Sequence, residues 1–252
     1  MPVLFVGHGN PMNAVEENEF SNTWIEIGKT LPVPRAILCI SAHWQTKGTK
    51  VTAMEKPKTI HDFYGFPKEL FDKQYAAPGS PLFAKETQRL IKRTSVELDY
   101  EWGLDHGCWS VLSRLFPAAE IPVYQLSLDY TQPPQYHYKL SKELSELRKK
   151  GVLIIGSGNI VHNLGMMQWN NSVYDWAKEF DEQIKNCIQR GDHQSVIHYE
   201  KLGASAKLAV PTNEHYLPLL YSLALQDSKD PLAFFSEKTV MGSVSMRSVK
   251  IG

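Results

Sequence analysis

Four histidines stand where apolar, strand-like runs give way to turns or short polar stretches, and their imidazoles could bind a divalent metal ion. They are His8, His43, His162 and His215. Imidazole is a ligand for zinc, iron and other transition metals. One histidine after a strand is usually structural, but several at equivalent strand ends have no structural reason to coincide. We therefore interpret the pattern as the metal site of an enzyme.

The elements that would position these histidines alternate between strands and helices. Apolar runs predict buried strands at 2–6, 35–41, 51–54, 121–128 and 152–156. Periodic polar and apolar spacing predicts helices at 16–31, 81–94, 109–116, 136–150, 176–190 and 211–225. The final segment, 239–251, alternates loosely and predicts an antiparallel edge strand.

Strands interleaved with helices indicate an α/β fold with a central, mostly parallel β-sheet and helices on both faces. The chain shows neither an internal repeat nor a linker, so we expect one catalytic domain over residues 1–252. Ligands of such sheets bind beyond the carboxyl ends of the strands. His8, His43 and His162 fall at that edge in this interpretation.

Composition and charge narrow the class of partner. Lys+Arg and Asp+Glu both number 27, and this balance argues against binding to nucleic acid or to an anionic membrane surface. No stretch approaches the roughly 20 apolar residues of a membrane span. The three cysteines are odd in number and far apart, as in reduced cytoplasmic proteins, and residues 1–7 lack a basic leader. We expect a cytoplasmic protein with a small substrate.

Six motifs along the chain carry a family resemblance. They are Gly7-His-Gly-Asn-Pro-Met12, Ser41-Ala-His-Trp44, His61-Asp-Phe-Tyr-Gly-Phe-Pro67, Leu104-Asp-His-Gly-Cys-Trp109, Gly156-Ser-Gly-Asn-Ile-Val-His-Asn163 and Glu214-His-Tyr-Leu-Pro218. In this order they resemble the class III extradiol ring-cleaving dioxygenases, in the 4,5-DOPA dioxygenase branch. The resemblance spans nearly the whole chain, although any single motif would be weak.

The resemblance implies a site built from histidines. It makes His8, His43 and His215 metal ligands, with Glu214 as an alternative for the third position. His162 would stand close to the metal, either as a ligand of a resting zinc form or as the acid/base in turnover. An imidazole that titrates near neutrality suits proton transfer to and from a catechol and its product.

Two further motifs are candidates for substrate binding. His106 is the second acid/base candidate and a substrate contact, while its bland interpretation is polar surface beside a helix capped by Asp105. In the motif 61–67, Tyr64 would offer a hydroxyl to the substrate from one wall of the pocket. Alternatively, Phe63 and Phe66 simply clamp this loop on the core.

The activity implied by the resemblance is the opening of a catechol ring, as in a DOPA-like aromatic diol, with O2 to give a semialdehyde. One divalent metal ion is expected, Fe(II) for dioxygenase activity, with Zn(II) as an alternative bound ion, because neutral nitrogen ligands suit both. Two other classes remain open. The same histidines could form a zinc-dependent hydrolase, or they could close a site in a non-catalytic binding domain.

Other local patterns give simpler interpretations. The turn Gly156-Ser-Gly158 follows a strand, but it lacks the lysine and spacing of a nucleotide loop. His137, His193 and His198 lie in charged or amphipathic segments and are expected at the surface. The six tryptophans are expected in the core or in pocket walls.

Overall fold

The computed structural model describes residues 1–170 and 172–252. Its centre is a six-stranded sheet with the strand order β6-β2-β8-β1-β12-β9. The strands are β1 (Val3–Gly7), β2 (Ala36–Ser41), β6 (Val123–Gln125), β8 (Val152–Gly158), β9 (Leu232–Phe235) and β12 (Ser248–Ile251). The four strands β6, β2, β8 and β1 run parallel, and β12 runs antiparallel to both β1 and β9.

Helices and short strand pairs surround this sheet. The helices are α1 (Glu19–Thr30), α2 (Lys68–Asp72), α3 (Pro81–Leu90), α4 (His106–Leu115), α5 (Pro134–Lys142), α6 (Ser145–Lys149), α7 (Asp175–Gln189), α8 (His193–Ile197), α9 (Ala204–Ala209) and α10 (Leu217–Ala224). Three single-turn 3-10 helices are η1 (Pro11–Ala14), η2 (Leu164–Met166) and η3 (Tyr199–Lys201). The pairs are β3 (Gln45–Thr46) with β7 (Leu128–Asp129), β4 (Thr49–Thr52) with β5 (Val96–Asp99), and β10 (Thr239–Val240) with β11 (Val244–Ser245).

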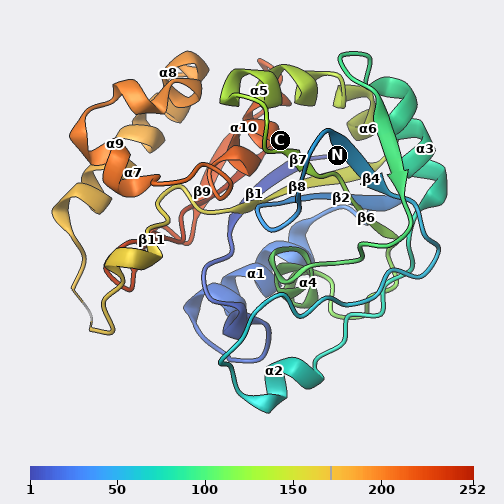
Figure 1. Cartoon of the computed structure of the whole chain (residues 1–252), viewed down its shortest axis with the longest axis horizontal. Helices are drawn as coiled ribbons and strands as arrows, with labels where there is room; N and C mark the ends of the chain where they lie inside the picture. The colour runs from blue at the N-terminus through green and yellow to red at the C-terminus, as the bar shows by residue number, and fades with distance from the viewer. Residues whose placement is uncertain (171) are drawn as a thin grey trace.

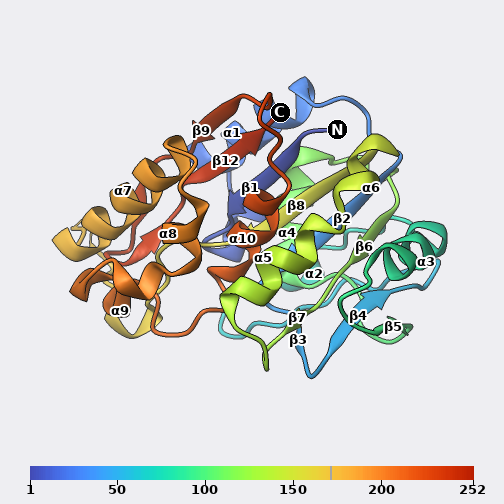
Figure 2. The ribbon, with the colours of Figure 1, turned by 90° about the horizontal axis from the view of Figure 1, so that it is seen from above.

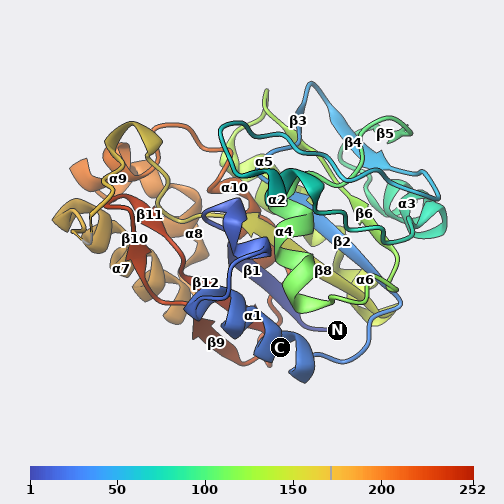
Figure 3. The same cartoon turned by 90° about the horizontal axis from the view of Figure 1, so that it is seen from below.

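The apolar runs of the parallel strands are continuous because both faces of the sheet are buried. Successive residues of β1 illustrate this: Val3 and Phe5 belong to one core, while Leu4 and Val6 belong to the other. Helices α5, α7 and α10 cover the first face, and α1 and α4 cover the second. The two layers are seen from either side in Figure 2 and Figure 3. This confirms the predicted α/β architecture.

Several predicted elements differ in detail. The helix expected at 136–150 is two helices, α5 and α6, and the one expected at 211–225 begins only at Leu217, with Pro218 in its first turn. The segment 239–251 does supply an antiparallel strand, β12, but β9 forms the sheet edge beside it. Within the described residues, no helix combines the length and apolarity needed to cross a bilayer.

The surface prediction for His137 is wrong. This side chain is fully buried in α5, and its Nδ1 lies 3.0 Å from the Tyr221 hydroxyl of α10. The tryptophan prediction also fails at one position, because Trp169 is 83% exposed.

Candidate metal centre

Parallel strands deliver the first two histidines to one edge of the sheet. His8 directly follows β1, and His43 stands two residues beyond β2. His215 precedes α10 and reaches the same place because its carbonyl accepts the backbone N–H of Asn159, at 2.8 Å, just beyond β8. Gly158 makes this approach possible: a Cβ there would lie 2.1 Å from the carbonyl oxygen of His215. The glycine that ends β8 thus serves close packing.

His8, His43 and His215 each place a side-chain nitrogen within 4.8 Å of the others. Nε2 of His8 lies 3.2 Å from Nε2 of His43. Two imidazoles bound to one ion at about 2.1 Å hold their nitrogens roughly 3 to 3.4 Å apart. The observed spacing therefore fits a single divalent ion between these rings.

Hydrogen bonds select which nitrogen each ring presents. Ser157 Oγ donates its proton to a hydrogen bond with the carbonyl of Gly107, at 2.5 Å. In its 2.9 Å contact with His8 it therefore accepts a hydrogen bond from Nδ1–H. Nδ1 of His215 likewise faces Glu214 Oε1 at 3.1 Å. Both rings therefore carry their proton on Nδ1 and leave the Nε2 lone pair for a metal. Glu214 thus orients His215, and together with His162 and His215 it also forms a second group that could hold a metal ion.

Burial keeps the three rings neutral. It lowers the pKa of His8 and His215 well below the ordinary value, and neighbouring histidines act in the same direction. Burial also lowers the pKa of His43 to about 3. A metal ligand must be an unprotonated imidazole. The site therefore offers three neutral nitrogen donors at any pH near neutrality.

His162 lies against this group of rings. Its imidazole stacks on that of His215, with ring centroids 3.4 Å apart and planes inclined by 9°. Burial lowers the pKa of His162 to about 4, so this ring does not titrate near neutrality as the acid/base role led us to expect. The backbone N–H of His162 donates to the carbonyl of Ala209, which fixes the chain beyond β8. The fourth histidine predicted from the sequence thus borders the three-nitrogen site.

His106 is brought to the opposite side of the site by the start of α4. Its ring centroid lies 3.8 Å from that of His43, and the residue is only 7% exposed, so it is no surface side chain. Asp105 does cap α4, because its Oδ1 accepts the backbone N–H of Cys108 at 3.1 Å. Asp105 also accepts hydrogen bonds from Ser41 and Gln125.

Asp62 is a site residue that the sequence interpretation missed. Its Oδ2 lies 3.0 Å from Nδ1 of His106 and 3.7 Å from Nδ1 of His43. Burial raises the pKa of Asp62, but the contacts with His106 outweigh burial and hold it below its ordinary value. Asp62 lies in the motif 61–67, where only Tyr64 had been proposed as a polar contact for the substrate.

Tyr64, the predicted substrate contact, is a surface residue in this structure. Its side chain is 91% exposed. The neighbouring Phe63 instead packs edge-on against His106, with centroids 5.6 Å apart, and against Phe66, at 5.3 Å. The motif therefore supplies a carboxylate and an apolar wall, and its aromatic residues clamp the loop as the simpler interpretation expected.

Two polar side chains from the same sequence motifs, Ser41 and Asn163, form their hydrogen bonds elsewhere than with the rings. Ser41 Oγ accepts the backbone N–H of His43 at 3.2 Å but contacts no ring nitrogen. The Asn163 side chain donates to the carbonyl of Leu208. The side chain that orients the His8 ring is Ser157, within β8.

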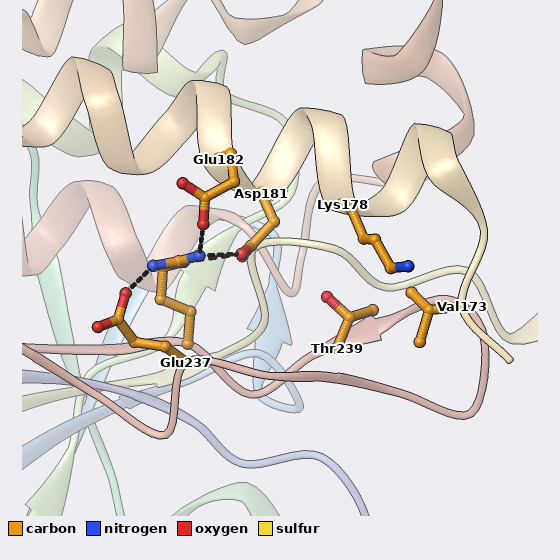
Figure 4. Close-up of a pocket in the computed structure, with 7 residues that line it drawn as sticks. Val173, Lys178, Asp181, Glu182, Glu237 and Thr239 are labelled. Carbon is orange, nitrogen blue, oxygen red and sulfur yellow. Dashed lines mark hydrogen bonds and ion pairs between the residues drawn. The ribbon is translucent and has the colours of Figure 1, made fainter. Parts of the chain in front are cut away.

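A separate cavity of about 290 Å³ lies between α7 and the C-terminal strands. Figure 4 shows Asp181, Glu182 and Glu237 directed at the buried guanidinium of Arg247. The Arg247 Nε donates to Asp181 Oδ2 at 2.7 Å. Because this cation is saturated by carboxylates, the cluster joins α7 to the strands and offers little to a ligand.

Comparisons with known proteins identify the family of this chain. Residues 4–246 match the family described as the catalytic LigB subunit of aromatic ring-opening dioxygenase. A 4,5-DOPA dioxygenase extradiol of Escherichia coli K12 is 47% identical over 259 residues, covering 100% of this chain and 95% of that protein. Its namesake from Beta vulgaris is 39% identical over 223 residues, covering 86% of this chain and 83% of that protein.

A solved structure supports the same relationship. The crystal structure of an uncharacterized protein from Escherichia coli K12 matches with a TM-score of 0.88 and 42% identity, covering 100% of both chains. The histidine cluster of the present chain could hold the metal ion on which such dioxygenases depend. The chain belongs to the family of the catalytic LigB subunit of aromatic ring-opening dioxygenases.

Proposed function

We propose that this enzyme opens the ring of DOPA or a closely related catechol, with both atoms of O2 entering a ring-opened semialdehyde. The ring carbons supply the electrons that reduce O2, so the reaction needs no external reductant. The observation that carries the proposal is the convergence of one imidazole nitrogen each from His8, His43 and His215 within 4.8 Å of one another. Relatives named 4,5-DOPA dioxygenase extradiol support the choice of substrate.

The proposed ion is Fe(II), held by these three histidines. The donor set fits, because all three rings are neutral and two of them are fixed with Nε2 free. When bound, the ion supplies open coordination positions at which the catechol oxygens and O2 can meet. The same nitrogens suit Zn(II), which we propose as a resting or inactive occupant. Family membership favours the dioxygenase over the zinc hydrolase and the non-catalytic domain.

His162 is the proposed acid/base. It stacks on His215, and its backbone N–H is held by the carbonyl of Ala209. A neutral ring in this place can take a proton from a catechol hydroxyl and return it to a product oxygen. His106, across the site, is the proposed substrate contact. The proposed catalytic unit spans residues 1–252, and its three free, buried cysteines fit the cytoplasm.

The test is reconstitution of metal-free protein with Fe(II) under anaerobic conditions, followed by O2 and a panel of catechols. We expect one O2 consumed per DOPA and a yellow semialdehyde product. Ester hydrolysis by the Zn(II) form without oxygen uptake by the Fe(II) form would contradict the proposal.

The His162→Ala variant tests the role of the acid/base. It should keep its metal and lose turnover by about 100-fold or more. Equal loss of metal and activity would make His162 a ligand. Activity close to wild type would remove it from the mechanism.

A further inference from the structure

Asp62 makes two contacts with one residue on another element. Its Oδ1 accepts the backbone N–H of His106 at 2.9 Å, and its Oδ2 lies 3.0 Å from Nδ1 of the same residue. The two positions are 44 residues apart, so the loop that carries Asp62 must be folded against the start of α4. Among the described residues, the ion-pair contacts of Asp62 are with His106 and His43 and include no lysine or arginine.

The surroundings of His106 leave its ring little freedom. His106 is the first residue of α4, where Asp105 caps the helix and fixes the backbone. Phe63 packs against one part of the ring and His43 against another. Packing alone does not decide which ring nitrogen of His106 carries the proton, because the two tautomers have the same shape.

The carboxylate decides between these tautomers. An ionised carboxylate only accepts hydrogen bonds, so the nitrogen that faces it carries the proton. Nδ1 of His106 is that nitrogen. It lies 3.0 Å from Oδ2, is buried, and has no aligned hydrogen-bond partner among the described residues, so this carboxylate is the acceptor within reach. Nε2, two ring atoms away, then keeps its lone pair.

We propose that Asp62 is a positioning residue that holds His106 as the Nδ1-protonated tautomer, so that Nε2 accepts a hydrogen bond from a catechol hydroxyl. The proposal rests on the proposed function, in which His106 contacts the substrate. The proposal also predicts a substrate specificity. With Nε2 of His106 as acceptor, a free hydroxyl is favoured over a methyl ether, which has no proton to donate. A purely structural Asp62 would only anchor its loop on α4.

The variant Asp62→Asn separates the two roles. Its Oδ1 can still accept the backbone N–H of His106, so the anchor is retained. Its amide N–H₂ would then face Nδ1 and favour the opposite tautomer, with Nε2 protonated. We expect unchanged metal content and melting temperature, and a kcat/KM for DOPA lower by about 100-fold or more. The matched control is Asp72→Asn, on exposed α2, which should behave as wild type.

A double-mutant cycle tests whether Asp62 acts through His106. If it does, Asp62→Asn should change kcat/KM by less than about twofold in a His106→Ala background. Losses that multiply would overturn the proposal. So would wild-type kinetics in Asp62→Asn. If Asp62→Asn melts at a lower temperature or loses metal, and Asp62→Glu has the same defect, then the role of Asp62 is structural. That result would also overturn the proposal.

Binding without turnover gives a readout that does not depend on dioxygenase activity. The Zn(II)-loaded protein is titrated with 4-nitrocatechol, whose visible spectrum reports the state of its hydroxyls. We expect Asp62→Asn to weaken binding by about 10-fold or more and to alter the bound spectrum. Equal affinity and spectrum would refute the role of Asp62. Absence of oxygen uptake by the wild type with every catechol would instead refute the proposed function, and this titration would still decide the Asp62 question.

Discussion

The approach of His215 to β8 gives a quantitative test of how the metal site is built. In Gly158→Ala the new Cβ would lie 2.1 Å from the carbonyl oxygen of His215, so this backbone must move away by about 1 Å to reach an acceptable contact. Metal–ligand distances tolerate only about 0.2 Å of error. We expect the affinity for Zn(II) or Fe(II) to fall at least tenfold to a hundredfold, about 1.4 to 2.7 kcal/mol. Overpacking should also lower the free energy of unfolding by about 1 to 3 kcal/mol.

The assay is competition for Zn(II) against a chromophoric chelator, combined with thermal melting of the metal-free protein. Gly165→Ala is the matched control, because its Cβ would meet only the Asn163 side chain, at 3.4 Å. This control should bind metal as wild type does. If Gly158→Ala binds the ion with unchanged affinity, then His215 does not depend on close contact with β8, and its assignment as a ligand positioned by that contact is refuted.

Three further outcomes are expected. His8→Ala and His43→Ala should each weaken metal binding by about 100-fold or more without changing the circular dichroism spectrum, and full metal content in either would contradict its assignment as a ligand. Arg247→Ala should lower the free energy of unfolding in urea by about 3 kcal/mol, because it leaves a buried carboxylate unpaired; an unchanged midpoint would show that the cluster contributes nothing. Burial lowers the pKa of His137 from 6.5 to about 4, so the unfolded chain binds this proton first as the pH falls. The contribution of His137 to the free energy of unfolding should be fully present above pH 6.5 and should decline by about 3 kcal/mol towards pH 4. A His137→Gln variant with the same pH dependence as the wild type would refute this.

The sequence was most informative where local pattern and tertiary position coincide. Continuous apolar runs predicted β1, β2 and β8, because strands covered on both faces need apolar residues at every position. His8 and His43 follow two of these strands, so parallel pairing alone places them at one edge. The approach of His215 could not be read in this way, because it depends on the packing of α10 against two glycines of β8.

The burial of His137 is predictable from the spacing of the residues around it in α5. Leu140 and Ser141, at helical spacing from His137, face the same core, whereas the lysines of α5 occupy the other face. The histidine therefore lies on the apolar face of an amphipathic helix. The charges of the segment obscure this position, whereas the 3.6-residue period places His137 on the apolar face.

The groups that orient the rings mark the limit of sequence reasoning in this site. Ser157 and Asp62 meet histidines 149 and 44 residues away, and no local pattern states which nitrogen they touch. Glu214 is adjacent to its histidine, yet its sequence position alone allowed it to be taken for a ligand. The difference is chemical, because a carboxylate bound to Nδ1 directs Nε2 to the metal, whereas a carboxylate ligand would replace a neutral donor with a charge. Three neutral donors would leave more positive charge on a bound ion than a site with a carboxylate ligand, so the partners of Nδ1 matter to the charge of the proposed site as much as the proposed ligands do.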